Sequence, residues 1–244
     1  MAGVRQLPLD LPTRPALLRE DFLAAPANAA ALALVDSFPD WPAHVVTLVG
    51  PPGAGKSHLG AIFARKANAL TLAAHDLTRA GVPQALAQGA LLLEDLAAGD
   101  FDEAALFHLL NLAREQNAFV LMTARTPPAA FVLATADLAS RLRAVPSVEI
   151  APADDALLGA VLVKLFADRQ IPVDEATVQY LLLRMERTVE GAQALVAAID
   201  RAALAARRPV TRSLAAQVLS EQKALRGESP SDFGDEDDAE APPS

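Results

Sequence analysis

Cysteine is absent from the 244-residue chain. Its absence excludes disulfides, thiolate zinc sites and cysteine nucleophiles, and it fits a reducing compartment. Aromatic residues make up only 5% of a chain that is 52% hydrophobic, so the core must be built from Leu, Val, Ile and Ala, which favours a helix-rich α/β protein. The sequence also shows no basic N-terminal region followed by an apolar stretch and no apolar run of membrane-spanning length. We therefore expect a soluble, cytoplasmic protein that does not contact membranes.

Lysine and arginine are missing from residues 228–244, which carry seven acidic side chains. The whole chain has a net charge of −9, so the remainder is close to neutral at −2. A near-neutral body with an acidic tail argues against broad electrostatic binding of nucleic acid, and we expect no sequence-specific DNA binding. Residues 227–244 are predicted to form a disordered acidic tail.

What the sequence does contain is a phosphate-binding motif. Residues 45–49 are apolar and β-branched, which predicts a buried parallel strand. The strand is followed by a G-x-x-x-x-G-K-[ST] motif made of Gly50, Pro51, Pro52, Gly53, Ala54, Gly55, Lys56 and Ser57. Glycines allow backbone N–H groups to turn toward an anion at a helix N-terminus. We expect Lys56 to reach the β- and γ-phosphates and Ser57 to offer its hydroxyl to Mg²⁺. The alternative, a glycine-rich turn without a ligand, is disfavoured by the strand before the motif and the helix after it.

Two carboxylates end a second apolar run. Residues 90–96 predict a buried strand that delivers Glu94 and Asp95 to the edge of the sheet where the phosphates would lie. Carboxylates at this place can hold the Mg²⁺ shell and orient a water molecule. The alternative is an ordinary strand that ends in solvated acids.

The remaining pattern predicts an α/β domain followed by a helical one. Further strands are expected at residues 69–74, 118–123 and 147–150, and helices at 28–38, 56–67, 83–87, 102–116 and 137–143. From residue 154 onward only helices are expected, at 154–168, 174–184, 189–206 and 212–225. The domains are therefore predicted as a flexible N-terminal segment at 1–18, a nucleotide-binding domain at 19–152, a helical lid domain at 153–226 and the tail.

Two features leave alternatives open on pattern alone. Arg141 is either a surface cation or ion-pair partner, or an arginine presented to the nucleotide of another subunit. Residues 6–11, Gln-Leu-Pro-Leu-Asp-Leu, alternate leucines on an extended segment behind an amide, which suits a peptide that docks in an apolar pocket. The alternative for this segment is a disordered leader.

Taken together, these motifs resemble the AAA+ ATPases, and within them the Hda family in the branch of the bacterial replication initiator DnaA. Residues 55–59 are similar to the G-[KR]-[ST]-H-L form of Walker A in this branch, which adds His58 to the nucleotide site. Phe22 and Leu23, with Asn28, resemble the segment that covers the adenine. Glu94 and Asp95 occupy the Walker B position. The resemblance implies a AAA+ P-loop fold with a parallel five-stranded sheet and a smaller C-terminal helical lid.

The resemblance also assigns the remaining segments. Residues 123–128 look like sensor I, residues 137–142 like the arginine-finger helix, and residues 187–191 like the sensor II helix, with Arg187 closing the lid onto the phosphates. Gln6, Leu7, Leu9 and Leu11 then resemble a peptide that binds the DNA polymerase III β sliding clamp. The implied ligands are ADP or ATP with Mg²⁺, and self-association is also compatible with the family.

The implied activity is catalysis in trans. A clamp-bound, nucleotide-loaded protein would place Arg141 against the γ-phosphate held by DnaA, stimulate its ATP hydrolysis and so limit replication initiation. The chain departs from the family pattern where Glu94 replaces the usual Walker B aspartate and where Arg125 stands at the acidic position of sensor I. We therefore expect tight nucleotide binding with slow hydrolysis in this chain's own site.

Three other functions share the P-loop. A helicase-loading ATPase would not explain the N-terminal peptide, and a DNA-bound initiator would need a DNA-reading domain and a more basic body. A small-molecule kinase fits worst, because the helical lid follows the sheet instead of interrupting it.

Overall fold

The computed structural model describes residues 17–206 and 208–225 of the chain. The chain divides into two compact units, Met1–Pro152 and Ala153–Ser244. The first unit holds the sheet, and the described part of the second is helical.

A parallel sheet organises the first unit. β1 (Val45–Val49) lies between β4 (Phe119–Ala124) and β5 (Ser147–Glu149), while β3 (Ala90–Leu96) pairs with the other side of β4 and β2 (Leu70–Ala73) pairs with β3. The strand order is β2-β3-β4-β1-β5, and every neighbouring pair is parallel. The predicted five-stranded parallel sheet is confirmed. Because all strands run the same way, the carboxyl ends of β1, β3 and β4 lie at the same edge of the sheet. Ligands bind at this edge in open α/β sheets.

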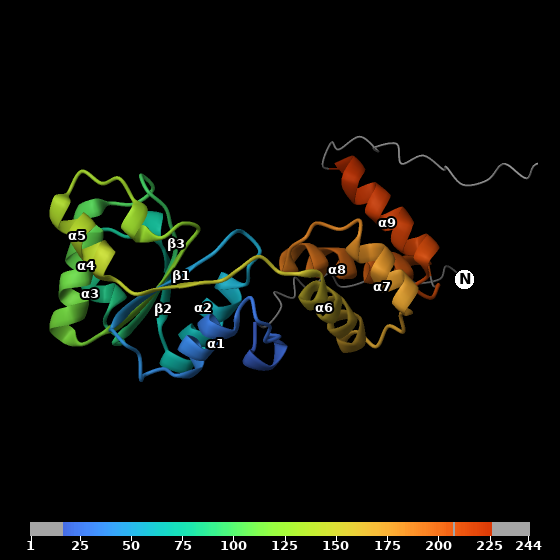
Figure 1. Ribbon diagram of the computed structural model, residues 1–244, viewed down its shortest axis with the longest axis horizontal. Helices are drawn as coiled ribbons and strands as arrows, with labels where there is room; N and C mark the ends of the chain where they lie inside the picture. The colour runs from blue at the N-terminus through green and yellow to red at the C-terminus, as the bar shows by residue number, and fades with distance from the viewer. Residues whose placement is uncertain (1–16, 207, 226–244) are drawn as a thin grey trace, which may run out of the picture. The chain divides into compact units, whose positions relative to one another are not determined.

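Helices cover both faces of this sheet (Figure 1). The helices are α1 (Ala29–Asp36), α2 (Lys56–Ala67), α3 (Val82–Ala85), α4 (Glu103–Gln116) and α5 (Ala136–Ala144), with short 3₁₀ turns η1 (Arg19–Asp21), η2 (Ala74–Asp76) and η3 (Pro128–Ala130). One core cluster joins α3, α4 and α5 to the strands and includes Leu106, Leu109 and Leu142. The other joins α1 and α2 to the opposite face through residues such as Leu32 and Phe63. The central strands are buried on both faces, as their continuous apolar runs predict.

Local signals fix several helix ends. The Asp102 carboxylate accepts hydrogen bonds from Ala104 N and Ala105 N and so caps α4. Asn68 and Asn117 adopt left-handed backbone conformations, with φ of 51° and 53°, immediately after α2 and α4. Asparagine tolerates this conformation better than most residues, which explains why the chain turns there.

Other boundaries differ from the predicted ones. The first helix, predicted at residues 28–38, ends at Asp36, because Ser37 and the following residues form a turn. The strand predicted at 69–74 is shorter, since Ala74 already belongs to η2. The helix predicted at 174–184 ends at Leu182.

The second unit is a helical bundle. It contains α6 (Asp155–Asp168), α7 (Glu175–Leu182), α8 (Val189–Ala206) and α9 (Arg212–Leu225). Asp154 and Asp174 cap α6 and α7 by accepting hydrogen bonds from Leu157 N and Thr177 N. The bundle packs through aliphatic side chains, and Phe166 is fully buried in it.

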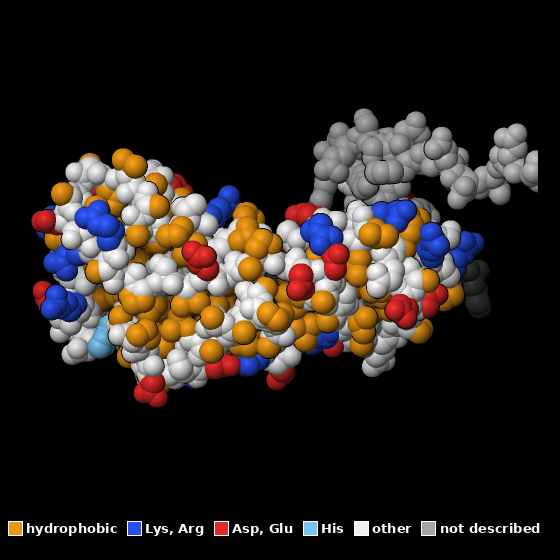
Figure 2. All heavy atoms as spheres, viewed as in Figure 1, with side chains coloured by type: hydrophobic (Ala, Val, Ile, Leu, Met, Phe, Trp, Pro, Cys, Tyr) orange, Lys and Arg blue, Asp and Glu red, His pale blue; other side chains and the backbone are white. Residues whose placement is uncertain are grey.

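Charged side chains of both signs lie on the face of the molecule shown in Figure 2. On the face shown in Figure 2, acidic and basic side chains are interspersed over both units instead of gathering by sign. In the described part of the chain, none of the helices combines the length and apolar character that crossing a bilayer requires.

Candidate nucleotide-binding site

The loop after β1 is shaped by its glycines. Gly50 N donates to Ala124 O over 3.1 Å, and a Cβ on Gly50 would lie 2.7 Å from Ile150 O. Gly53 and Gly55 have φ of 75° and 91°, a left-handed conformation that other residues adopt only with strain. The loop therefore needs glycine at these positions, and it delivers the chain directly into the N-terminus of α2, which attracts anions.

Lys56 lies in this loop and not in solvent. Only 8% of the surface of Lys56 is exposed. Its Nζ donates to Gly50 O and Pro51 O, each over 2.8 Å. The ammonium group is thus held among the backbone groups of the loop that would surround phosphate oxygens. A phosphate can replace these carbonyl contacts by stronger, charge-assisted hydrogen bonds.

Ser57 and Glu94 come together at the end of the strands. Burial raises the pKa of the Glu94 carboxyl above its usual range, repulsion by Asp95 raises it further, and a hydrogen bond from the Ser57 hydroxyl partly opposes both effects. Glu94 is half-buried and Asp95 is exposed. The sheet edge therefore places Glu94 directly beside the hydroxyl predicted to bind Mg²⁺.

A break in β3 separates the two acids. The pairing of β3 with β4 shifts register between Leu93 and Leu96, and Asp95 has a left-handed φ of 56°. Asp95 N donates to the Thr123 hydroxyl over 3.0 Å, and Thr123 is almost fully buried. Thr123, at the predicted sensor I position, thus fixes the backbone of the Walker B segment, a role that the sequence pattern did not indicate. Arg125 lies just beyond β4 and is exposed.

The residues present fit a nucleotide with its metal. Ser57, Glu94 and Asp95 offer oxygen ligands, which Mg²⁺ prefers, and such a metal usually takes only one or two protein carboxylates and completes its shell with phosphates and water. No group of three or more His, Asp or Glu side chains that could hold a metal is found among the described residues. In a bound Mg·ATP complex the metal would supply charge neutralisation at the phosphates, while Lys56 and the loop N–H groups bind and orient them.

The segment before α1 packs against the P-loop. Phe22 is buried, and its ring atoms would lie 3.3 Å from a Cβ on Gly55. The ring also contacts His58 edge-on, with centroids 5.1 Å apart. His58 Nε2 lies 2.8 Å from Leu18 O, so His58 holds this segment against α2. Phe22 and His58, both predicted at the nucleotide site, are therefore neighbours beside the loop.

Asn28 orders the same segment in an unexpected way. It occupies the capping position before α1, but its side chain makes no capping hydrogen bond to the helix. The side-chain oxygen instead accepts from Ala25 N over 2.9 Å, and the amide nitrogen donates to Leu23 O over 3.0 Å. Asn28 is 4% exposed, and the turn that it closes fixes the backbone of Leu23, a residue predicted from the family resemblance to cover the adenine.

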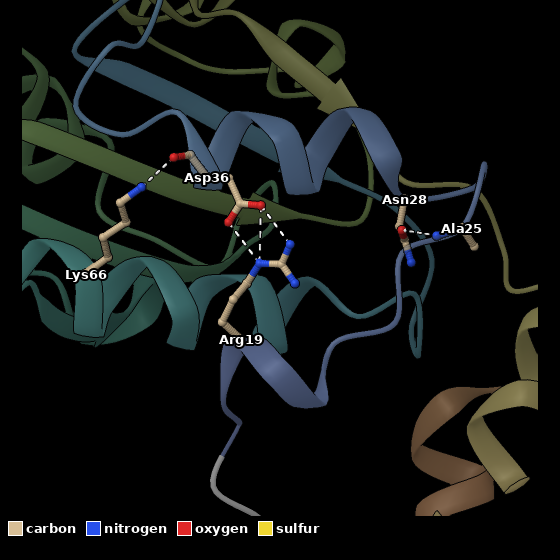
Figure 3. A network of polar contacts seen from close by, with 5 residues as sticks. All are labelled: Arg19, Ala25, Asn28, Asp36 and Lys66. Atoms are coloured by element: carbon tan, nitrogen blue, oxygen red, sulfur yellow. Dashed lines mark hydrogen bonds and ion pairs between the residues drawn. The ribbon is translucent and has the colours of Figure 1, made fainter. Parts of the chain in front are cut away.

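An ion pair anchors the start of the segment (Figure 3). Arg19 donates from Nε to Asp36 Oδ1 over 2.9 Å and from Nη2 to Oδ2 over 2.8 Å. Lys66 Nζ donates to Asp36 O, which joins α2 to the same point. The hydrogen bonds from Arg19 hold the pKa of Asp36 below its usual range. η1, α1 and α2 are thereby connected at the side of the nucleotide site.

Arg141 lies on α5, away from this constellation. The residue is half-buried, and its guanidinium carbon lies 4.9 Å from the centre of the Phe107 ring on α4. No ion pair of Arg141 with a carboxylate is found among the described residues. Its charge is therefore not neutralised by a neighbouring acid there.

The other predicted residues belong to the helical unit or fall outside the described residues. Arg187, just before α8, forms an ion pair with Asp155 at the start of α6, within the helical unit. Gly191 follows in the first turn of α8, where a Cβ would lie 2.7 Å from Glu186 O. The assignment of Arg187 to the phosphates stays a prediction. Gln6, Leu7, Leu9 and Leu11 lie outside the described residues, as does the acidic tail.

Known structures share the architecture. Domain III of the replication initiation protein DnaA from Thermotoga maritima matches with a TM-score of 0.70 at 14% sequence identity, over 85% of this chain and 97% of that chain. A replication initiator DnaA bound to AMPPCP and single-stranded DNA matches with a TM-score of 0.64 at 18% identity over 76% of this chain, which spans 65% of that chain. The fold is that of a AAA+ P-loop NTPase. The RuvB Holliday junction branch migration motor of Thermotoga maritima has the same fold, with a TM-score of 0.60 at 18% identity over 73% of this chain and 61% of that chain.

At these identities the likeness shows a DnaA-like AAA+ fold and not a shared activity. No protein-family model and no curated protein sequence matches the chain.

The raised pKa of Glu94 predicts a measurable effect of pH on stability. A carboxyl whose pKa is higher in the folded state stabilises the fold below its unfolded pKa, near 4.5, and this contribution is lost as pH rises through the folded pKa. The nucleotide-free Glu94→Gln variant should therefore be more stable than the wild type at pH 7, and the difference should vanish near about pH 4. Thermal unfolding across this pH range measures it.

Asp100→Asn is the control, since Asp100 is an exposed carboxylate in the loop after β3. Its unfolding temperature at pH 7 should match that of the wild type, because Asp100 is not buried. Equal stability of Glu94→Gln and the wild type at pH 7 would contradict the burial argument.

Proposed function

We propose that this protein binds ADP or ATP with Mg²⁺ and, docked on the DNA polymerase III β sliding clamp, stimulates ATP hydrolysis by DnaA in trans. Such a protein limits replication initiation by converting DnaA to its ADP form. The observation that carries the proposal is Arg141, which lies half-buried on α5 in a DnaA-like AAA+ fold and has no carboxylate partner among the described residues. An arginine finger supplied in trans raises hydrolysis by roughly 10³ to 10⁵ in P-loop NTPases.

The nucleotide site of this chain is better suited to binding ATP or ADP than to hydrolysing ATP. Gly50, Gly53 and Gly55 shape the loop. In this proposal, Lys56 and Ser57 would bind the phosphates and metal, and Phe22 and Leu23 would cover the adenine. Glu94 carries its charge on a longer side chain than aspartate and resists ionisation. We therefore propose slow intrinsic hydrolysis, so that bound nucleotide serves mainly to stabilise the docking form.

An ATPase assay tests the function directly. DnaA loaded with ATP is incubated with DNA-loaded clamp, with and without this protein, and released phosphate is measured. The expected result is a large rise in DnaA turnover that requires both the clamp and this protein. Turnover that stays at the level of DnaA alone would exclude the proposal, and turnover by this protein in the absence of DnaA would favour a helicase-loading ATPase with its own cycle.

Clamp binding is predicted to depend on the N-terminal peptide. The double change Gln6→Ala and Leu9→Ala removes an amide anchor and one of three alternating leucines, so the clamp should no longer retain the protein in a pull-down. The matched control is Pro8→Ala, which keeps the anchor and all three leucines. Equal retention of the double variant and the wild type would show that this segment does not bind the clamp.

A further inference from the structure

Three contacts join α4 and the residues just before it to α5 and the residues just before it. They follow the same order along both stretches of the chain. Before the helices, the rings of Phe101 and Phe131 lie 6.3 Å apart. At the start of α4, Glu103 accepts hydrogen bonds from Ala134 N and Thr135 N, each over 2.9 Å. One turn later, the Phe107 ring lies under the guanidinium of Arg141. Because residues i and i+4 share a helix face, α4 directs Glu103 and Phe107 toward the same neighbour.

Glu103 anchors the two residues that lead into α5. Thr135 occupies the capping position, but its side chain makes no capping hydrogen bond. The carboxylate of Glu103 instead binds the backbone N–H groups of Ala134 and Thr135 from the neighbouring helix and places a negative charge at the positive end of the α5 dipole. These hydrogen bonds lower the pKa of Glu103, so the carboxylate is fully charged at neutral pH.

Phe107 acts on the other end of the same helix. Its ring offers a negative face to the guanidinium, and such a contact is directional while leaving the N–H groups of the cation available to an anion. A salt bridge would occupy these N–H groups, whereas an aromatic face does not. Phe107 therefore restrains Arg141 without neutralising it.

We propose that Glu103 and Phe107 are positioning residues that hold α5 and orient Arg141 for the nucleotide of a neighbouring ATPase. The inference rests on the proposed function for its catalytic consequence, and on the contacts between α4 and α5 for its structural part. Neither residue is proposed to contact the nucleotide. Their effect is exerted through the orientation of one guanidinium.

The sharpest test compares Phe107→Leu with Phe107→Tyr. Leucine keeps apolar volume but removes the ring face, whereas tyrosine keeps it. In the DnaA ATPase assay, Phe107→Leu should lower the maximal stimulated turnover by about 10-fold or more, because small errors in placing a catalytic group are costly. The concentration for half-maximal stimulation should change less than about twofold, since Arg141 itself is retained. Phe107→Tyr should restore the wild-type maximum.

Glu103→Gln provides a second variant at a partly exposed position, where misfolding is not expected. Its amide has one oxygen acceptor in place of two, so it should also lower the maximum and leave this chain's own nucleotide affinity unchanged. Wild-type maxima in both Phe107→Leu and Glu103→Gln would overturn the inference.

A spectroscopic measurement separates this inference from the proposed function. The Arg141 side-chain Nε–H signal, assigned by its loss in Arg141→Lys, should be shifted by the ring current of Phe107. The shift should disappear in Phe107→Leu and persist in Phe107→Tyr. An unchanged signal in Phe107→Leu would overturn the contact itself, whereas a lost shift with no stimulation by the wild type would overturn the proposed function alone.

Discussion

Replacing Lys56 with alanine should abolish measurable binding of ATP and ADP. Lys56 Nζ is held by Gly50 O and Pro51 O inside the loop, so its charge is placed where phosphate oxygens would enter. Hydrogen bonds from a charged donor are worth about 1.5–3 kcal/mol each, and the loss of two of them corresponds to a fall in affinity of roughly 10² or more. Isothermal titration calorimetry with each nucleotide and Mg²⁺ measures the change.

The matched control is Lys66→Ala on the same helix. Lys66 also donates to a backbone oxygen, that of Asp36 (Figure 3), but it lies in the last turn of α2, whereas Lys56 begins the helix. This variant should bind nucleotide like the wild type. ATP should raise the unfolding temperature of the wild type and of Lys66→Ala but not that of Lys56→Ala. Affinity within about threefold of wild type in Lys56→Ala would contradict the assignment of the loop.

The parts of the site that could be predicted are those encoded locally. A β-branched strand, a glycine-rich loop and a helix follow one another within residues 45–67, so the motif and its supporting elements come from one stretch of sequence. The strands could be recognised individually by their apolar runs. Their order could not, because nothing in the periodicity of β4 indicates that it pairs between β1 and β3.

The parts that could not be predicted depend on contacts between distant residues. The bulge that leaves Asp95 exposed is stabilised by Thr123, 28 residues away in sequence. Asn28 carries a good capping side chain, but the closed turn with Leu23 and Ala25 uses it instead. Glu103 looks like an ordinary acid in the first turn of a helix, and only the packing of α4 against α5 brings it to Ala134 and Thr135. Each of these unpredicted contacts positions a candidate functional residue or the segment that carries one.

Arg141→Ala should abolish the stimulation of DnaA while leaving this chain's nucleotide affinity and clamp binding intact. The guanidinium lies on α5, on an element separate from the P-loop, so its removal does not disturb Lys56 or Ser57. Since an arginine finger contributes roughly 10³ to 10⁵ to hydrolysis, turnover should fall to that of DnaA alone. Arg141→Lys should not restore it, because an ammonium group lacks the planar, multidentate geometry of guanidinium.

Arg143 provides the matched control for this prediction. It lies on the same helix two residues later and is exposed, so Arg143→Ala removes the same charge from the same element. Two residues correspond to about 200° around a helix, which directs the two side chains to different sides of α5. A finger must be directed at one γ-phosphate, whereas a general electrostatic attraction to DnaA would depend on both arginines and would weaken with salt. Loss of stimulation in Arg141→Ala alone therefore identifies a finger, equal losses in both variants indicate charge attraction, and loss in Arg143→Ala alone would transfer the role to Arg143.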